Sequence, residues 1–402
     1  MLPPSPSKTC EAAERSAARL SPEGVNAAPG RGAALWALAA ILGLWLGFAN
    51  DVICAPPLVL LWPLGLAALG LGAPGAVAAF RRGWLTSLAG ATAALYWLSL
   101  PVHDVGGLPW ALAVPCAVFI AACITVAGGL FCAGARLGRH LPPWRLALSL
   151  ALFWYLLEYA AALTLGFPWL PLAGALAAWP LLVQTADSIG AYATGALWLW
   201  AGLLALFSLP RLAGLGDARL QTFGRALGQA RRFCPGRLAC GLVLAGLALA
   251  YGQWRLVATP LVTDPTGPDT LAVIFVEGNV DQGQKWLPDM QAETVDLYCS
   301  LTERGLAALR SETTEAGAEA SAAPERPLVI WPETALPFFY QTHRLAARVR
   351  DLVRREDVPL LFGAPGVERP ARTAGASAAA EPAIFNRAFL LGPDGRLAGT
   401  YD

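Results

Sequence analysis

Long apolar segments alternate with short polar ones over roughly the first 257 residues, and mixed patterning follows. Because a membrane-spanning helix needs about 20 mostly apolar residues, this pattern predicts about seven spans. Their approximate ranges are 33–50, 57–73, 76–100, 109–132, 146–165, 181–207 and 238–257. The first two flank Pro56-Pro57 and could instead form a tight or re-entrant hairpin. We therefore expect a polytopic α-helical membrane bundle over 33–257, after a polar, disordered segment 1–32.

Composition agrees with this division of the chain. The 402 residues are 56% hydrophobic and 14% charged, with a mean hydropathy of +0.50, whereas average domains are about 25% charged. Acids and arginines return to ordinary density from Asp264 onward. A water-soluble domain is therefore predicted over 258–402. The net charge of +1 provides no electrostatic footprint for nucleic acid.

Basic residues predict the orientation of the bundle, because cytoplasmic loops of membrane proteins carry an excess of Lys and Arg. The loops at 50–56, 101–108 and 166–180 contain neither. The opposite flanks hold Lys8, Arg15, Arg19, Arg31, Arg81, Arg82, Arg136, Arg139, Arg145, Arg211, Arg219, Arg225, Arg231, Arg232 and Arg237. The N-terminus is therefore expected in the cytoplasm, with residues after 258 outside. In a bacterium this means a multi-pass inner membrane protein with a periplasmic domain.

Alternating strand and helix patterns characterise the soluble domain. Predicted strands are 270–280 (covered on both faces), 328–331, 358–363, 383–391 and 396–401, and predicted helices are 290–310 and 343–355. The last two strands form a hairpin across Gly392–Gly395. This order predicts an α/β sheet layered with helices. Two Ala-rich stretches, 311–326 and 369–382, are expected to be loop insertions, either lids or inert loops.

Glu333 is the strongest candidate for chemistry. It follows the strand 328–331 behind a Trp-Pro corner, and active groups of open α/β sheets gather at the carboxyl ends of strands. This position favours a catalytic acid or base; the alternative is an exposed loop glutamate or a helix-capping partner. The soluble domain has one cysteine, Cys299, in the middle of a predicted helix, where a buried thiol would stay protonated.

Two further candidates lie in the predicted bundle. Glu158 is an acid inside an apolar segment, so it either lines a cavity facing a substrate or is a hydrogen-bonded packing residue. Trp169 ends the sequence Gly166-Phe-Pro-Trp169 and suits an interfacial aromatic belt or a lipid entry point. The eight cysteines contain no C-x-x-C pair, so neither a zinc site nor a disulfide framework is indicated. We expect no metal and no other cofactor.

Three motifs carry a family resemblance. Val-x-Gly-Asn-Val-x-Gln-x-x-Lys-Trp at 276–286 and Val-Ile-Trp-Pro-Glu-Thr-Ala-Leu-Pro at 329–337 follow the predicted bundle, and Asn386 comes next, in the hairpin. This order resembles the apolipoprotein N-acyltransferases, membrane-embedded members of the nitrilase superfamily. The resemblance implies that residues 258–402 are the N-terminal part of a nitrilase-like α/β/β/α sandwich.

The resemblance also implies a reaction. Enzymes of this family move an acyl chain from a phospholipid donor to the amine of the diacylglyceryl-cysteine of a lipoprotein acceptor, through a cysteine thioester. The partners implied are these two substrates and membrane lipid, without a cofactor. Glu333 matches the general base, and Trp286 matches a tryptophan near the entrance of the site. We expect Trp286 to position substrate, with core packing as the alternative.

Several positions depart from the family pattern. Glu277 replaces the commoner glutamine, and Ala161 and Ala162 stand where an arginine often follows the membrane glutamate. Lys285 matches the lysine before the motif tryptophan and is not the family's catalytic lysine. In the family, the catalytic lysine and the nucleophilic cysteine come after a Tyr-Asp pair. That pair corresponds here to Tyr401-Asp402. We therefore expect the 402-residue chain alone to be inactive, as a biological truncation or an artefact of the gene model.

Two other functions fit parts of the sequence. A non-catalytic membrane protein with a periplasmic partner-binding domain would explain the spans, but these carry few ionisable groups that could form an ion path. A membrane-tethered nitrilase-type amidase would use Glu333 on a soluble C–N substrate, but it gives no reason for about seven spans.

Overall fold

The computed structural model describes residues 31–48, 50, 52–166, 169–209, 233–259, 271–315, 326–368 and 382–402. The chain divides into two compact units, Met1–Pro260 and Leu261–Asp402. They are called here the membrane unit and the sheet unit. Residues 1–30 of the predicted disordered segment 1–32 lie outside the described residues, and so does the whole arginine-rich stretch 211–232.

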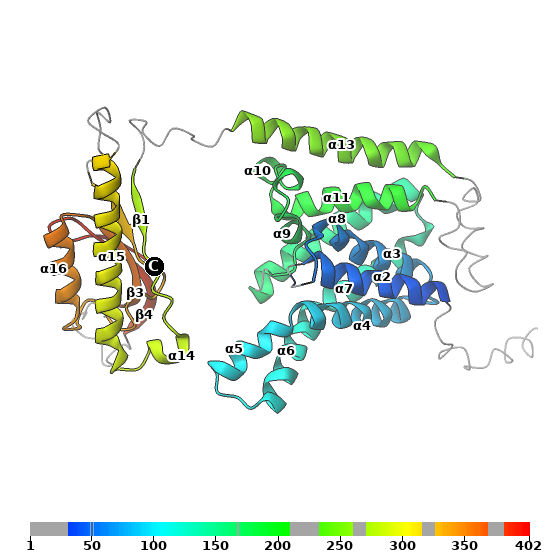
Figure 1. Cartoon of the computed structure of the whole chain (residues 1–402). Coiled ribbons are helices and arrows are strands. Elements are labelled where there is room, and N and C mark those ends of the chain that lie inside the picture. The colour runs from blue at the N-terminus through cyan, green and yellow to red at the C-terminus, as the bar shows by residue number, and fades with distance from the viewer. Residues whose placement is uncertain are drawn as a thin grey trace, which may run out of the picture. The chain divides into compact units, whose positions relative to one another are not determined.

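Helices make up the described part of the membrane unit (Figure 1). The longer ones are α2 (Arg31–Gly47), α3 (Leu61–Leu71), α4 (Ala76–Ala94), α6 (Trp110–Ile124), α7 (Val126–Leu137), α8 (Pro143–Leu165), α11 (Ala191–Leu206) and α13 (Pro235–Ala258). The shorter ones are η2 (Pro56–Leu60), η3 (Tyr96–Leu98), α5 (Ser99–Asp104), η4 (Gly138–His140), α9 (Leu172–Leu176), η5 (Pro180–Leu182) and α10 (Ala186–Ile189). Their buried faces share one apolar core that includes Trp62, Phe131 and Trp154.

Three helical stretches in the described residues are long and apolar enough to cross a membrane: Trp110–His140, Pro143–Leu165 and Pro235–Ala258. A fourth candidate is the pair Ala76–Ala94 and Tyr96–Asp104, which is bent by 65°. Shorter apolar helices at Gly32–Gly47, Pro56–Leu71 and Ala191–Leu206 overlap the other three predicted segments. The bundle is thus helical with three or four span candidates, and the larger number of spans stays a prediction.

Two predicted segments are not single straight helices. Between 181 and 207 the chain forms η5, α10 and α11, and Gly190 interrupts them with a φ of 82°. Only glycine adopts this backbone region without strain, so the apolar run is locally broken although its composition alone suits one helix. The segment 76–100 is likewise divided at the bend that follows α4.

The sheet unit contains a five-stranded mixed sheet in the order β1-β2-β3-β4-β5. Its elements are β1 (Val273–Phe275), α14 (Gln282–Lys285), α15 (Met290–Glu315), β2 (Leu328–Ile330), α16 (Ala346–Glu356), β3 (Leu360–Glu368), β4 (Ala383–Leu391) and β5 (Leu397–Tyr401). The first three strands are parallel and the last two join them antiparallel. Strands and helices therefore alternate as the sequence predicts.

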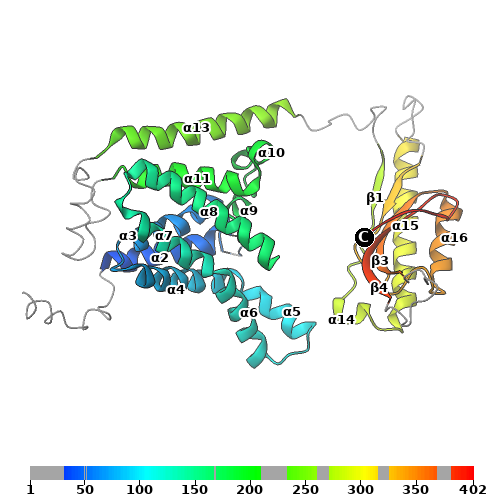
Figure 2. The same ribbon diagram turned by 180° about the vertical axis from the view of Figure 1, so that it is seen from behind.

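Both long helices of this unit cover the same face of the sheet. Crossovers between parallel strands are right-handed in nearly all proteins, so the successive connections β1–α15–β2 and β2–α16–β3 place α15 and α16 together, as Figures 1 and 2 show. Alternate residues of β3, such as Leu360 and Phe362, are buried. They form the core with Trp331, Val349 and Phe389.

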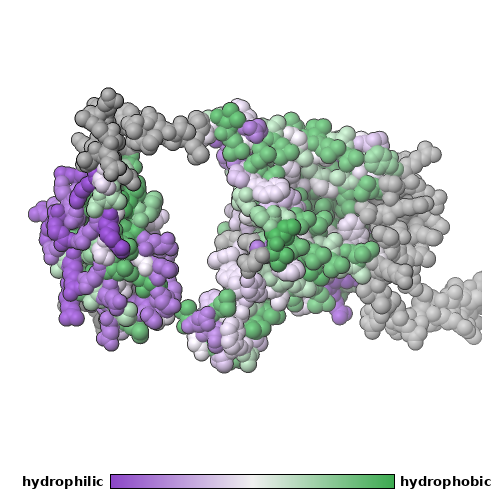
Figure 3. All heavy atoms as spheres, in the orientation of Figure 1, coloured by the Kyte–Doolittle hydropathy of each residue, from purple (hydrophilic) through white to green (hydrophobic). Residues whose placement is uncertain are grey.

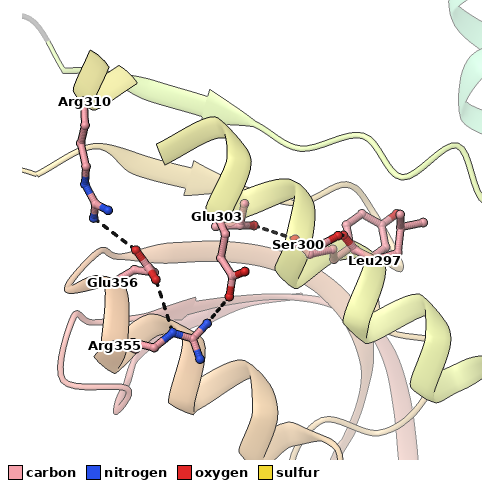
Figure 4. Close-up of polar contacts among 8 residues, drawn as sticks. Leu297, Ser300, Glu303, Arg310, Arg355 and Glu356 are labelled. Carbon is pink, nitrogen blue, oxygen red and sulfur yellow. Dashed lines mark hydrogen bonds and ion pairs between the residues drawn. The ribbon is translucent and has the colours of Figure 1, made fainter. Parts of the chain in front are cut away.

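Outer-face contacts between the two helices are polar. Arg355 pairs with Glu303 of α15, and its Nε lies 3.4 Å from Glu356 Oε1 (Figure 4). Arg310 Nη2 of α15 lies 3.2 Å from Glu356 Oε2, and Ser300 Oγ donates back to Leu297 O at 2.9 Å. Figure 3 shows hydrophilic side chains over this face and hydrophobic ones over α11 and α13 of the membrane unit.

Some predicted boundaries in the sheet unit are wrong. The predicted strand 270–280 pairs only over Val273–Phe275, because Gly278 and Asn279, with a φ of 46°, lead the chain out of the sheet. Its two faces are not both covered, since Phe275 is 77% exposed. The helix α15 continues to Glu315, so the predicted insertion 311–326 begins as helix. Residues 316–325 and 369–381 lie outside the described residues.

Candidate active site

A tight turn positions Glu333 directly after β2. The carbonyl oxygen of Pro332 accepts from Gly363 N and Ala335 N, each at 3.2 Å, and Thr334 has a φ of 52°. A Cβ at Gly363 would lie 2.6 Å from Thr334 N and 2.8 Å from Glu333 Cα. Glycine therefore allows the turn to lie against β3, and Glu333 is held at the strand end with its side chain exposed.

Asn386 is the hydrogen-bond partner of Glu333. Its Nδ2 donates to Glu333 Oε1 at 2.5 Å. The antiparallel register pairs Asn386 with Pro365, two residues beyond Gly363 on β3. A hydrogen bond to an ionised carboxylate is among the stronger neutral-donor contacts and fixes the orientation of the acceptor. The pairing was not predicted from the sequence, although the resemblance had drawn attention to Asn386.

Lys285 also lies within the electrostatic reach of Glu333. It ends the short helix α14, which begins with Asp281 Oδ1 accepting from Gly283 N at 2.8 Å and from Gln284 N at 3.2 Å. The side chain is buried, and burial lowers the pKa of its ammonium group while the charge of Glu333 acts in the opposite direction. The sequence motif gave Lys285 no catalytic role, but in the structure the charge of Glu333 acts on its ammonium group.

Trp286 follows Lys285 and is 52% exposed. It therefore does not belong to the core of the sheet unit, and its indole surface is free to meet a ligand.

The two membrane-unit candidates, Trp169 and Glu158, differ from each other. Trp169 is exposed, with its ring centroid 6.2 Å from that of Trp97. Glu158 Oε1 accepts from Trp154 Nε1 and from Leu172 N, each at 2.8 Å, and so ties α8 to α9.

Cys299 is a poor nucleophile where the structure places it. It lies half-buried on α15, and burial, followed by the nearby charges of Asp296 and Glu303, raises the pKa of its thiol to about 11. The thiol is therefore protonated at neutral pH, in agreement with the sequence-based expectation. Within the described ranges, no group of three or more His, Cys, Asp and Glu side chains is placed to hold a metal ion.

Arg387 anchors the strand that carries Asn386. It is buried, with its Nη2 2.8 Å from Glu368 Oε1 and 2.6 Å from Asp402 Oδ2. Hydrogen bonds to these two carboxylates raise the pKa of Arg387, and the bond from Arg387 lowers the pKa of Asp402. The sequence offered no signal for this network, because its members come from the end of β3, the middle of β4 and the residue after β5.

Comparisons with known proteins indicate the family of the chain. Residues 41–204 match the model of the apolipoprotein N-acyltransferase N-terminal domain. The chain is 30% identical over 326 residues to the apolipoprotein N-acyltransferase of Geobacter metallireducens, covering 81% of this chain and 54% of the relative. It is 32% identical over 369 residues to that of Azotobacter vinelandii, covering 85% and 58%. The chain spans about half the length of the curated relatives it matches.

The apolar helices and the matched domain define the protein as a membrane protein with an attached α/β sheet. Within that class, the chain belongs to the apolipoprotein N-acyltransferase family.

Proposed function

We propose that the protein takes part in lipoprotein N-acylation, with Glu333 as general base. The acyl chain would come from a membrane phospholipid and pass to the N-terminal amine of a diacylglyceryl-cysteine. The observation that carries the proposal is the Glu333–Asn386 pair at the end of a parallel strand, in a chain whose relatives are named apolipoprotein N-acyltransferase. An exposed carboxylate with one oxygen oriented by an amide can accept and return a proton repeatedly.

Two proton transfers would use this carboxylate. In the first step, Glu333 takes the proton of an attacking thiol and returns it to the leaving lysophospholipid oxygen, as the thioester forms and the ester bond breaks. In the second, it takes a proton from the attacking amine and returns it to the leaving thiolate, as the amide forms. Asn386 would keep the carboxylate aligned in both steps.

Cys299 is not proposed as the attacking thiol, because its pKa of about 11 disfavours the thiolate. Trp286 is proposed to position substrate with its exposed indole. The sheet unit would belong to a nitrilase-like sandwich, which its order of parallel then antiparallel strands supports. No cofactor enters this scheme.

The proposed setting is a bacterial inner membrane. About seven spans, with the N-terminus cytoplasmic and residues after 258 periplasmic, would follow the distribution of Lys and Arg. Trp169 and Trp97 would then lie near the periplasmic interface, where tryptophan is enriched. Alkaline phosphatase fused after Asp402 should be active, and a fusion at Leu141 should not; the reverse pattern would reject this orientation.

The activity test uses the gene product isolated from its own cells through a tag at Met1, with its length measured by mass spectrometry. Membranes holding it are incubated with acyl-labelled phospholipid and a diacylated lipopeptide. We expect a triacylated product from the native protein and a loss of at least about a hundredfold in rate for Glu333→Gln, as is usual on removal of a general base. Asn386→Ala should reduce the rate less than Glu333→Gln.

Glu303→Gln is the matched control, because Glu303 is an exposed glutamate of the same unit whose partner is Arg355. It should keep the native rate. A Glu333→Gln protein as active as the native one would remove Glu333 from the mechanism. Hydrolysis of soluble amides without lipopeptide acylation would favour the tethered amidase instead.

A further inference from the structure

Asn386 lies in a part of β4 that is paired on one side. β3 pairs with β4 over the whole range Ala383–Leu391, whereas β5 pairs with it only over Ala388–Leu391. The twist between paired strands varies, and it is largest in two-stranded ribbons. The backbone that carries Asn386 is therefore less constrained than the part of β4 that lies between two strands.

The Asn386 amide depends on this backbone for its direction. Its Nδ2 donates to Glu333 Oε1 at 2.5 Å, and within the part of the chain that the structure describes no second hydrogen bond holds it. The side chain is exposed, so close packing does not fix it either. Glu333 is held separately, by the turn after β2. A change in the twist of β4 would thus move the amide relative to the carboxylate.

Arg387 supports this part of β4 from the opposite face. Successive side chains of a strand point to opposite faces, and Arg387 is 6% exposed while Asn386 is exposed. The stem of Arg387 lies across β3, since a Cβ at Gly366 would come within 2.8 Å of its Cβ, Cδ and Nε. Its Cζ lies 5.3 Å from the ring centroid of Phe385. Packing therefore holds the side chain independently of its charged partners.

The guanidinium of Arg387 links the two strands that flank β4. Its Nη2 donates to Glu368 Oε1, at the last residue of β3, at 2.8 Å and to Asp402 Oδ2, directly after β5, at 2.6 Å. Its Nε donates to the other carboxylate oxygen of Asp402. This fork onto one carboxylate has a fixed geometry. Arg387 thus connects the neighbouring strand ends at the level where direct pairing of β4 with β5 stops.

We propose that Arg387 is a positioning residue of the Glu333 site. By joining Glu368 to Asp402, it fixes the twist of β4 at the point from which the Asn386 amide meets Glu333. The inference rests on the proposed role of Glu333 as general base. Arg387 itself does not touch substrate in this scheme, because its side chain lies on the face opposite Asn386. Alignment matters at such a site, since a misplacement of 1 Å can lower a rate about a hundredfold.

The Asn386 amide is itself the probe for the test, because the chain has four asparagines, Asn26, Asn50, Asn279 and Asn386. The full chain is isotopically labelled in its asparagine side-chain amides, placed in nanodiscs and examined by NMR. Asn386→Ala identifies the Asn386 resonance by its disappearance. Glu333→Ala offers no acceptor and therefore gives the shift of the unbonded amide. Arg387→Met should move the Asn386 resonance most of the way to that shift, and a native resonance in this variant overturns the proposal.

Matched variants separate positioning from stability. Arg396→Met removes an arginine of the same hairpin that is 87% exposed and pairs with Asp394, and it should leave the Asn386 resonance unchanged. Val349→Ala weakens the core of the sheet unit from α16, and it should lower the thermal midpoint without moving the resonance. A resonance that moves as far in Val349→Ala as in Arg387→Met would make the effect one of general stability and overturn the proposal.

The two partners of Arg387 test the link from its ends. Glu368→Ala and Asp402→Ala each break one end, and each should move the Asn386 resonance in the same direction as Arg387→Met. A native resonance in either variant would show that the two strand ends need not be joined, and it would overturn the proposal.

Kinetics supply a second readout in the acylation assay. Arg387→Met should lower kcat about tenfold through misalignment, with KM unchanged. Because Arg387 acts through Asn386, it should cause no further loss in Asn386→Ala, and additive losses in the double variant would overturn the proposal. The resonance measurement needs no turnover, so the two proposals fail separately. Full activity of Glu333→Gln removes the general base, whereas a native resonance in Arg387→Met rejects the positioning role and leaves Glu333 in place.

Discussion

The two units of this protein differ in the residues that make their internal packing contacts. In the membrane unit, a Cβ at Gly47 would lie 2.4 Å from Val59 N, and one at Gly70 would lie 2.3 Å from Cys132 O. In the sheet unit, the core is built from large rings, including Trp331, Phe362 and Phe389. Several helix contacts of the membrane unit thus depend on glycine, whereas large rings fill the core of the sheet unit.

Solvent explains the difference. Lipid tails are as apolar as leucine, so helices in a membrane gain little from burying large side chains and associate through close contact of small residues. In water, the same burial yields about 25 cal/mol per Å² of apolar surface. The two candidate glutamates, one in each unit, also differ in their surroundings. Glu333 is exposed with one amide partner, whereas Glu158 has two donors on one oxygen and none on the other.

The largest effect is expected from emptying the sheet-unit core. Trp331→Ala removes a ring that is 2% exposed, stacks on Tyr298 with centroids 5.2 Å apart, and donates to Thr302 Oγ1 at 2.9 Å. The cost should be about 3–5 kcal/mol of unfolding free energy. Hydrogen exchange of the β2 and β3 amides measures it. Trp286→Ala, at a 52% exposed position, should change the unfolding free energy by less than about 0.5 kcal/mol. Equal losses for the two variants would contradict the assignment of Trp331 to the core and of Trp286 to the surface.

The next effect should come from adding one methyl group to the membrane unit. Gly47→Ala places a Cβ against the backbone of Val59, and overpacking of this kind costs about 1–3 kcal/mol. Gly75→Ala is the control, because no heavy atom lies within 4 Å of its added Cβ. Thermal denaturation in detergent compares the two. If both variants melt alike, close glycine contact does not hold α2 against η2.

A pH-dependent effect should appear around Arg387. The pKa of Asp402 is lowered, chiefly by its hydrogen bond from Arg387. A carboxyl group with a depressed folded-state pKa contributes stability above its unfolded pKa of about 3.9, and this is lost as pH falls through the folded value. Asp402→Asn should therefore melt below the native protein at pH 7, and the gap should close as the pH falls below about 4. A gap independent of pH would exclude an ionic origin.

The smallest effect should come from the exposed helix pair. Glu303→Gln breaks the ion pair with Arg355, in which both side chains are about half exposed. Exposed pairs contribute about 0–1 kcal/mol and are screened by salt. Urea denaturation in low salt should show a small loss that 1 M NaCl removes. A loss above about 2 kcal/mol would mean that this face contributes to stability as the apolar core does.

Much of the sheet unit could be predicted because its patterns are local. The hairpin 383–391 with 396–401 is observed as β4 and β5 within one residue at each end, since Gly392–Gly395 is a strong turn signal. The predicted strand 270–280 was too long, because an apolar run does not say where pairing partners end. Its exposed Phe275 shows that an apolar run alone does not establish cover on both faces either.

The sequence by itself determined the family, the helical bundle followed by an α/β sheet, and the strand end that carries Glu333. These follow from hydropathy, periodicity and short motifs, each of which is read within a few neighbouring residues. Only the tertiary structure decided that Asn386 orients Glu333, that Lys285 is buried within its field, and that Glu158 joins α8 to α9 with one oxygen unpaired. These depend on strand register and helix packing, which bring together residues far apart in the chain.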